Sequence, residues 1–291
     1  MKKIGLLATV ALLAASASQA QLNSVTAELK LDQDQYLPGE DLQLKLRIMN
    51  RSGQPITLGT DNAWIIMSIT AENNLPCAQL GEMPIQGAFS LLSGQVGTKA
   101  LNPTPYFSFR QQGRYRITAK IRIPQWQQEV NCKSVSFTVA NGVPLPNLGN
   151  LQFGVPLPPG ATNTTPEIRT FSLLKVSDLK ELKLYFRLND SMGKTLRTFP
   201  LAGMTSFSDP EAQIDRYNNL HVLHQTGARS FNYAVIGPEG QWVAHQTYTY
   251  AGTRPELRVN QNGQIFVMGG ARRFSDNDFP QPAPAPESAR Q

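Results

Sequence analysis

Residues 113–123 read GRYRITAKIRI, and this stretch decides the fold class. From Tyr115 to Ile123 every second residue is apolar or aromatic, while the residues between them are mostly basic. Because successive side chains of a β-strand point to opposite faces, this alternation predicts a strand with one buried and one solvated face. The same alternation recurs from Val25 to Leu31 and from Leu42 to Ile48. The pattern is typical of an antiparallel sheet that covers a core on one side.

The composition favours β-structure throughout the 291 residues. A hydrophobic content of 41% with only 16% charged residues excludes a disordered chain. The 22 glycines and 21 prolines favour turn-rich β-structure over a helical bundle. At about 100 to 200 residues per domain, the length predicts about two domains. With 3 histidines and 2 cysteines, the chain lacks the residues for most metal clusters and for a disulfide-dense scaffold.

The first twenty residues, 1–20, predict export. Two lysines precede an apolar run from Ile4 to Ala15, and the small residues Ser18 and Ala20 follow. This is the pattern of a bacterial secretory signal peptide that is cleaved after Ala20. We therefore predict a periplasmic or extracellular protein. No later stretch reaches the roughly 18 apolar residues of a transmembrane helix, so no membrane span is expected.

The charge distribution bears on whether nucleic acid is a partner, and the cysteine content bears on whether a disulfide forms. The formal net charge is +6, and basic and acidic residues almost balance in each half of the chain. Such an even distribution is not the clustered footprint of a nucleic-acid-binding protein, and no nucleic acid is expected as a partner. An oxidising compartment makes Cys77 and Cys132 candidates for one disulfide, and the alternative is that both stay free.

Residues 21–141 predict a β-sandwich domain. A further apolar segment surrounds Trp64, Ile66 and Ser68, where the large indole is expected at the centre of the core, and a last strand is expected from Val135 to Val139. Seven or so short strands in about 120 residues, separated by turn signals, are typical of an immunoglobulin-like sandwich.

Two stretches of this domain carry a resemblance to known families. The sequence YLPGEDLQLKLRIMNRSGQPITL, from Tyr36, resembles the opening strands of exported bacterial immunoglobulin-like domains and is similar to proteinase-inhibitor domains of the BsuPI type. GRYRITAKI resembles the penultimate strand of such modules, with Tyr115 at the position of a tyrosine corner. The resemblance implies an immunoglobulin-like fold and, for the BsuPI type, inhibition of a protease.

Proline-rich segments flank the second half of the chain. Residues 142–166 contain six prolines with little periodicity, which predicts a semi-rigid linker in which Leu151, Phe153 and Val155 are expected to pack against one domain. The Pro/Ala-rich residues 280–291 are interpreted as a disordered tail.

Residues 167–279 contain an internal repeat. PEAQIDRYNNLHVL from Pro210 aligns without gaps with PELRVNQNGQIFVM from Pro255, and both predict a strand, a tight turn and a strand. A period near 45 residues built from hairpins is that of propeller blades. Only about two and a half units fit, whereas a closed propeller needs at least four blades. We expect an incomplete, blade-like β-repeat domain, of a kind that resembles modules of uncharacterised secreted bacterial proteins.

No catalytic set, metal site or cofactor site is predicted. His221 and His224 have an H-x-x-H spacing, but residues three apart on a strand face opposite sides. One of them is expected to be a hydrogen-bonded residue of the sheet. No G-x-S-x-G elbow occurs, and we interpret Asp215 and Asp278, each near a second acid, as turn and solvent-facing residues.

Binding surfaces are the stronger candidates. Around the turn after His224, an amide from Gln225 and a guanidinium from Arg229 predict a polar contact site, and the alternative is an ordinary β-turn. After Gly240, alternation predicts one face with rings that would stack on a sugar or an extended peptide if exposed, and would form core if buried. The residues of that face are Trp242, Ala244, Gln246, Tyr248 and Tyr250.

The sequence therefore predicts an all-β, non-enzymatic exported protein that binds a protein or cell-envelope partner through its β-modules. Two alternatives stay open, a protease inhibitor acting through the immunoglobulin-like domain and an exported hydrolase using the second domain. An oligomer is one way for an incomplete blade set to cover its exposed strand edges.

Overall fold

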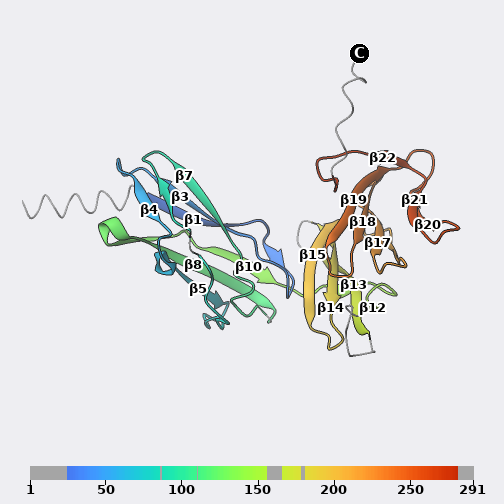
Figure 1. Cartoon of the computed structure of the whole chain (residues 1–291), viewed down its shortest axis with the longest axis horizontal. Helices are drawn as coiled ribbons and strands as arrows, with labels where there is room; N and C mark the ends of the chain where they lie inside the picture. Colours follow the sequence, from blue (N-terminus) through green and yellow to red (C-terminus); the bar gives the residue numbers. More distant parts are fainter. Residues whose placement is uncertain (1–24, 86, 110, 156–165, 178–180, 281–291) are drawn as a thin grey trace, which may run out of the picture. The chain divides into compact units, whose positions relative to one another are not determined.

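The computed structural model describes residues 25–85, 87–109, 111–155, 166–177 and 181–280 (Figure 1). Within these ranges the chain is all-β, with two short 3₁₀ helices and no α-helix, so no described helix has the length and apolar content needed to cross a membrane. It divides into two compact units, residues 1–140 (unit 1) and 141–291 (unit 2). The predicted signal peptide and all of the predicted tail beyond Pro280 lie outside the described residues.

Unit 1 contains two principal sheets. The first has the strand order β1-β3-β7, and the second has the order β2-β10-β8-β5, with β9 also paired to β8. Only the β2–β10 pair is parallel among these. The strands are β1 (Val25–Leu31), β2 (Gln35–Tyr36), β3 (Leu44–Asn50), β5 (Ile65–Ala71), β7 (Val96–Leu101), β8 (Gly113–Ile123), β9 (Gln128–Asn131) and β10 (Val135–Val139), with β4 (Ile56–Leu58) and β6 (Phe89–Leu91) forming a small third sheet.

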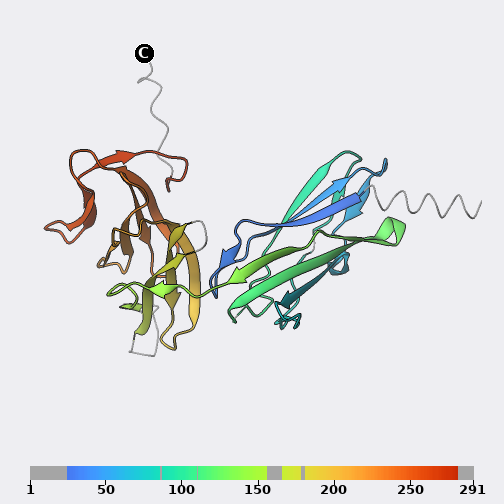
Figure 2. The ribbon, with the colours of Figure 1, turned by 180° about the vertical axis from the view of Figure 1, so that it is seen from behind.

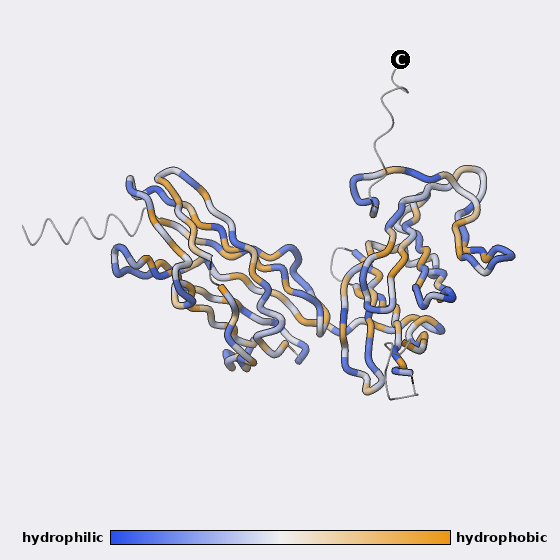
Figure 3. The backbone as a smooth tube through the Cα atoms, viewed as in Figure 1, coloured by the Kyte–Doolittle hydropathy of each residue, from blue (hydrophilic) through white to orange (hydrophobic). Residues whose placement is uncertain are grey.

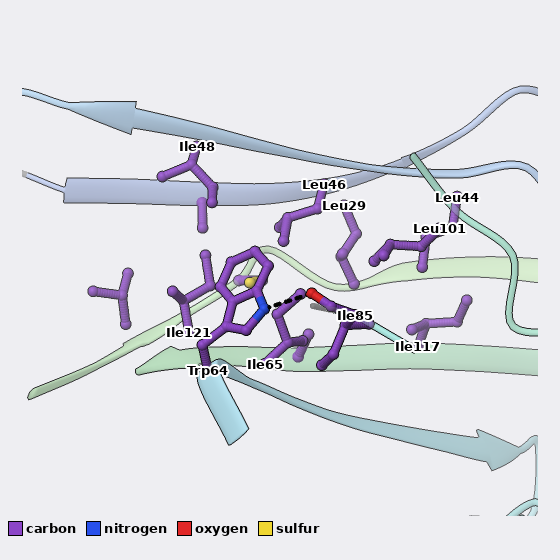
Figure 4. Packing of buried hydrophobic residues seen from close by; sticks show 14 of the residues in the cluster. Leu29, Leu44, Leu46, Ile48, Trp64, Ile65, Ile85, Leu101, Ile117 and Ile121 are labelled. Carbon is purple, nitrogen blue, oxygen red and sulfur yellow. Dashed lines mark hydrogen bonds between the residues drawn. The ribbon is translucent and has the colours of Figure 1, made fainter. Parts of the chain in front are cut away.

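The core of unit 1 lies between the two sheets, as the alternating pattern predicts. Every inward residue of β8 from Tyr115 to Ile123 is at most 4% exposed, and the intervening residues face solvent. Trp64 is 1% exposed and projects between the sheets, where its Nε1–H donates to the Ile85 carbonyl oxygen at 2.9 Å (Figure 4). Ile66 is 44% exposed, because the 3₁₀ turn Asn62–Trp64 precedes β5 and Ile65 faces inward instead.

The hydroxyl of Tyr115, the residue that the resemblance places at a tyrosine corner, donates to the Gln111 carbonyl oxygen at 2.8 Å. Replacing Tyr115 with phenylalanine should lower the free energy of unfolding by about 1 kcal/mol, because the buried ring stays while the hydrogen bond is lost. Urea denaturation followed by near-UV circular dichroism measures the change. The control is Tyr106→Phe, in the same unit, which should alter the free energy by less than about 0.5 kcal/mol. Equal effects of the two variants would contradict the role of the corner.

Cys77 and Cys132 are free thiols, so the candidate disulfide is absent. Cys77 hydrogen-bonds through its backbone to Ile69 of β5, on the side away from β8, and Cys132 bonds to Ala119 of β8, on the side away from β5. Two strands therefore separate the cysteines. Three strand spacings amount to about 14 Å, twice the Cα separation of about 7 Å that a disulfide tolerates.

Unit 2 consists of three layers of antiparallel strands (Figures 1 and 2). The first sheet has the order β11-β13-β14-β15 with β12 paired to β13, the second has the order β16-β17-β18-β19-β22, and the third layer is the hairpin β20-β21. The strands are β11 (Val143–Pro144), β12 (Leu151–Val155), β13 (Glu167–Ser177), β14 (Leu182–Asn189), β15 (Thr195–Gly203), β16 (Glu211–Ile214), β17 (Leu220–Gln225), β18 (Ser230–Ile236), β19 (Trp242–Thr249), β20 (Glu256–Val259), β21 (Ile265–Met268) and β22 (Ala271–Arg273).

The predicted linker is partly built into unit 2. β11 and β12, from residues 143–155, both pair with β13, and Phe153 is 6% exposed in the core. The expectation of a spacer is therefore wrong for this part, while the expected packing of Phe153 is confirmed. β11 pairs only with β13, and an edge strand tolerates proline because no neighbour needs its missing N–H. Residues 156–165 lie outside the described residues.

The middle sheet of unit 2 is buried on both faces. One face packs against the first sheet through residues such as Val222 and Ile236, and the other packs under the hairpin through Leu223, Val235 and Leu257. All six residues of β17 are consequently buried, including both of its histidines. Hydrophobic segments follow the strands of both units in Figure 3, with hydrophilic segments at many of the turns.

Both hairpins predicted from the repeat are present, and their strands begin 45 residues apart at Glu211 and Glu256 and at Leu220 and Ile265. The same five-residue turn closes four hairpins of unit 2. In each, the first residue's N–H donates to the fifth carbonyl, and the fourth residue has a φ between 62° and 77°. The turns are Asp190–Lys194, Asp215–Asn219, Gly237–Gln241 and Asn260–Gln264.

Candidate functional site

A β-bulge in β19 determines which side chains form the candidate site. Val235 of β18 pairs with Ala244 and the next residue, Ile236, pairs with Trp242, so Val243 is an extra residue. The extra residue turns Trp242 to the face opposite Ala244. The predicted single face from Trp242 to Tyr250 is therefore wrong.

The two faces of β19 have different neighbours. The Trp242 indole lies 5.2 Å from the Phe199 ring of the first sheet, between ring centroids. Tyr248 packs half-buried on the opposite face, under the hairpin, where its hydroxyl donates to Gln246 Oε1 at 3.0 Å. The two rings predicted to act together are thus divided by the sheet.

A pocket of about 390 Å³ lies beside Trp242. Leu201 of β15 and Trp242 and His245 of β19 form one part of its lining, and Asn277 and Phe279 from the C-terminal segment form the rest. The indole meets the His245 ring edge to face, with centroids 5.6 Å apart and planes at 87°. Phe279 is 50% exposed at the pocket. The lining is mostly apolar, with one imidazole and one amide residue.

The C-terminal segment is fixed at the pocket by backbone and side-chain contacts. His245 and Phe279 exchange two backbone hydrogen bonds, at 2.7 and 2.9 Å. The Asp278 carboxylate accepts from Arg272 at 2.7 Å, and Asp278 is 3% exposed, which corrects its interpretation as a solvent-facing residue. Burial acts to raise the pKa of Asp278, but the hydrogen bonds from Arg272 and Ser275 and the charge of Arg272 act together to lower it, and the net shift of the pKa is downward. Phe279 is thus held in place by an ionised neighbour.

His245 is the only imidazole in the lining of the pocket, and its tautomer follows from one contact. Nδ1 lies 2.7 Å from the Asn277 carbonyl oxygen, and a carbonyl can only accept, so Nδ1 carries the proton. In the neutral ring Nε2 is then an acceptor, and among the described residues it makes no hydrogen bond. The pocket therefore offers two aromatic surfaces and one acceptor, which suits an apolar or ring-shaped group that carries a donor at its edge.

The predicted polar contact site is not assembled. His224 is 2% exposed and faces the first sheet. Gln225 is 6% exposed, and its side-chain nitrogen donates to the Gly227 carbonyl oxygen at 2.9 Å, which closes its own turn. Arg229 stacks over the Tyr250 ring at 5.5 Å instead. These contacts are those of an ordinary β-turn, which was the alternative to a polar contact site.

Sequence reasoning missed a buried network under the hairpin. His221 Nδ1 lies 2.6 Å from the Tyr233 hydroxyl, and its Nε2 lies 3.1 Å from the Asp215 carboxylate, which confirms one histidine as a hydrogen-bonded sheet residue. Burial acts to raise the pKa of Asp215, but hydrogen bonds from Asn219 and His221 outweigh it and the pKa is lowered. Asp215 is therefore not the solvent-facing residue that we expected. The spacing of Asp215 and Asn219 within one turn was the available signal.

A second cavity, of about 690 Å³, lies in unit 1 between the turn after β5 and the segment that leads into β8. Cys77 lines it, and its Sγ–H donates to the Ser108 carbonyl oxygen at 3.0 Å. Burial raises the pKa of the Cys77 thiol, so the group stays protonated and is a poor nucleophile. No group of three or more His, Cys, Asp or Glu side chains in the described part of the chain is arranged to hold a metal ion.

The fold thus defines an all-β protein of two units with a half-open aromatic pocket. No protein-family model and no curated protein matches the sequence. Among solved structures, the sporulation control protein Spo0M from Bacillus subtilis is similar at 12% identity and a TM-score of 0.30, over 61% of this chain and 91% of that one.

Proposed function

We propose that this chain is a non-enzymatic exported protein that binds a protein partner of the cell envelope through the pocket beside Trp242. The observation that carries the proposal is the pairing of a fixed indole with the half-exposed Phe279 at one apolar pocket. Tryptophan and other aromatic residues dominate the binding energy of protein interfaces. The volume suits one large apolar side chain or a proline from the partner.

The placement of the histidines supports binding rather than catalysis. His221 is held between Asp215 and Tyr233, and His224 is buried between two sheets. His245 stands at the pocket without a serine or cysteine among the residues that line it. A nucleophile activated by a base requires both groups within hydrogen-bond reach. Protease inhibition by unit 1 and hydrolysis by unit 2 stay predictions.

The finer fold assignment is part of this proposal. For unit 1 we propose an immunoglobulin-like sandwich of the BsuPI-like kind, supported by its three-stranded and five-stranded sheets and by the Tyr115 corner. For unit 2 we propose an incomplete set of propeller blades, supported by its stacked layers and its repeated turn. Both units then act as rigid frames for binding surfaces.

Replacing Phe279 with serine should weaken partner binding at least tenfold while leaving the fold intact, because the ring is half exposed. A photo-reactive phenylalanine analogue at position 279 would first identify the partner by crosslinking in envelope extracts. Binding of that partner to the wild type and the variant is then measured by surface plasmon resonance.

The matched control is Phe207, which is 74% exposed and does not line the pocket. The analogue at position 207 should give no shared crosslink, and Phe207→Ser should bind normally. Identical crosslinks from both positions, or equal affinities of wild type and Phe279→Ser, would refute the proposal.

A further inference from the structure

The outward face of β8 carries four cations, two on each side of Thr118. Arg114, Arg116, Lys120 and Arg122 alternate with buried residues and are all exposed. We call these four residues the β8 cationic face. At about 3.4 Å per residue, they extend over about 27 Å of one strand, in the middle of a sheet. The sequence of residues 113–123 already alternates basic and apolar residues, and the fold places the basic ones together on one exposed face of a sheet.

The two arginines at the start of this face lack acidic partners. Lys120 and Arg122 share the Glu129 carboxylate, at 3.4 and 3.6 Å. Arg114 and Arg116 make no ion pair with any described residue. A guanidinium presents a planar fork of N–H donors that matches the oxygens of a phosphate group. These two side chains are therefore available to an anionic ligand.

A small hollow lies between the two arginines. It has a volume of about 140 Å³ and is lined by both arginines and by the hydroxyl residues Thr70 and Ser136, with Glu72 and Asn74 also in its lining. Thr70, Arg116 and Ser136 lie directly side by side on β5, β8 and β10. At about 30 Å³ per water molecule, the hollow has room for one tetrahedral oxyanion. Guanidinium and hydroxyl donors around such a space suit a phosphate group.

Exposed apolar side chains next to the cations favour a lipid surface as the source of that phosphate. Ile66, which is 44% exposed, lies directly beside Lys120 on the same outward face. Leu75, 60% exposed, projects from the turn after β5. Interfacial proteins combine cations that attract anionic headgroups with apolar residues that enter the headgroup region. A nucleic acid would require the cations but not the apolar residues.

We propose that the β8 cationic face binds the surface of an anionic phospholipid bilayer, with one headgroup phosphate in the hollow between Arg114 and Arg116. The proposal goes beyond the pocket of unit 2 and uses none of its residues. Phe279→Ser should therefore bind vesicles like the wild type, so failure of one proposal is distinguishable from failure of the other.

The test uses the chain from Gln21 onward, because an apolar leader would itself enter vesicles. Co-sedimentation with phosphatidylcholine vesicles, with and without phosphatidylglycerol, should show binding only to the anionic vesicles, and added salt should weaken it. The double variant Arg114→Gln with Arg116→Gln should bind roughly 30-fold more weakly. The control Lys45→Gln with Arg51→Gln removes the same charge from exposed positions at the other sheet and should lose less than about threefold.

Two further arms separate the sources of phosphate. Inorganic phosphate at constant ionic strength should compete with the vesicles in the wild type and have no effect on the residual binding of the arginine variant. Binding of inorganic phosphate without binding of anionic vesicles would overturn the lipid assignment. Equal losses in the two double variants, or tighter binding to a DNA duplex than to the vesicles, would also overturn it.

Discussion

Replacing Trp64 with alanine should lower the free energy of unfolding of unit 1 by about 4 kcal/mol. The indole is 1% exposed and packs edge to face on Phe89, with ring centroids 5.5 Å apart. Its loss leaves a cavity between two sheets that are fixed by their ladders and cannot close around it. Lys99 also donates to the Ile85 carbonyl that the indole contacts, so the cavity, rather than an orphaned carbonyl, dominates the loss.

The exchange rates of the β8 amide protons measure this loss, because these protons exchange with solvent only when the core of unit 1 unfolds. Trp64→Phe should lose about half as much, which keeps the test usable if the alanine variant does not fold. Trp126→Ala is the control, because that ring is only half-buried in a 3₁₀ turn. An equal loss for Trp64→Ala and Trp126→Ala would show that Trp64 is not central to the core.

The parts of unit 1 that the sequence predicted correctly are those where alternation continues without interruption. In β1, β3 and β8 each apolar position has a polar neighbour, so one face must be buried. The orientation of the segment after Trp64 could not be predicted in the same way, because a 3₁₀ turn places both Trp64 and Ile65 inside and leaves Ile66 44% exposed. That turn depends on the Asp61 side chain, which caps it through the Ala63 N–H and leaves the hydropathy pattern unchanged.

The candidate site was predicted less well because two of its determinants are not local. The extra residue Val243 has no signature in the hydropathy pattern, yet it places Trp242 on the opposite face from Tyr248. His224 is buried because its face of β17 packs against the first sheet, whose strands come from residues 143–203, well before β17 in the chain. The apolar residues of β17 do not alternate, which is typical of a strand buried on both faces, and this was the available signal.

The stability of unit 2 should fall as the pH drops from about 6.5 towards 4, because of His224. Burial lowers the pKa of His224 to about 4, and the charge of His245 also acts to lower it. The Gly203 carbonyl acts to raise this pKa, although neither ring nitrogen of His224 makes a hydrogen bond of normal geometry. In the unfolded chain the pKa is about 6.5. Below pH 6.5 the unfolded chain therefore binds a proton that the folded chain excludes, and stability falls by up to about 3 kcal/mol.

Carboxylates act in a different pH range. The pKa values of Asp215 and Asp278 are lowered in the folded chain. Their contribution to the stability of unit 2 is therefore present above the usual carboxylate pKa, and it is lost only as the pH falls through the pKa values of the folded chain. Between pH 7 and pH 5 both groups stay ionised. The change in unfolding free energy between pH 7 and pH 5 should therefore come from His224.

His224→Leu should remove about 2 kcal/mol of the difference in unfolding free energy between pH 7 and pH 5. At pH 7 the variant should be as stable as the wild type or more stable, because two buried ring nitrogens without hydrogen bonds are replaced by an apolar side chain beside Val222 and Leu220. Hydrogen exchange of the β17 and β18 amides, corrected for the intrinsic rate at each pH, gives both values. Gln225→Leu, next in the strand, is the control and should keep the full pH dependence. A His224→Leu variant with the wild-type pH dependence would mean that this imidazole takes up its proton in the folded chain.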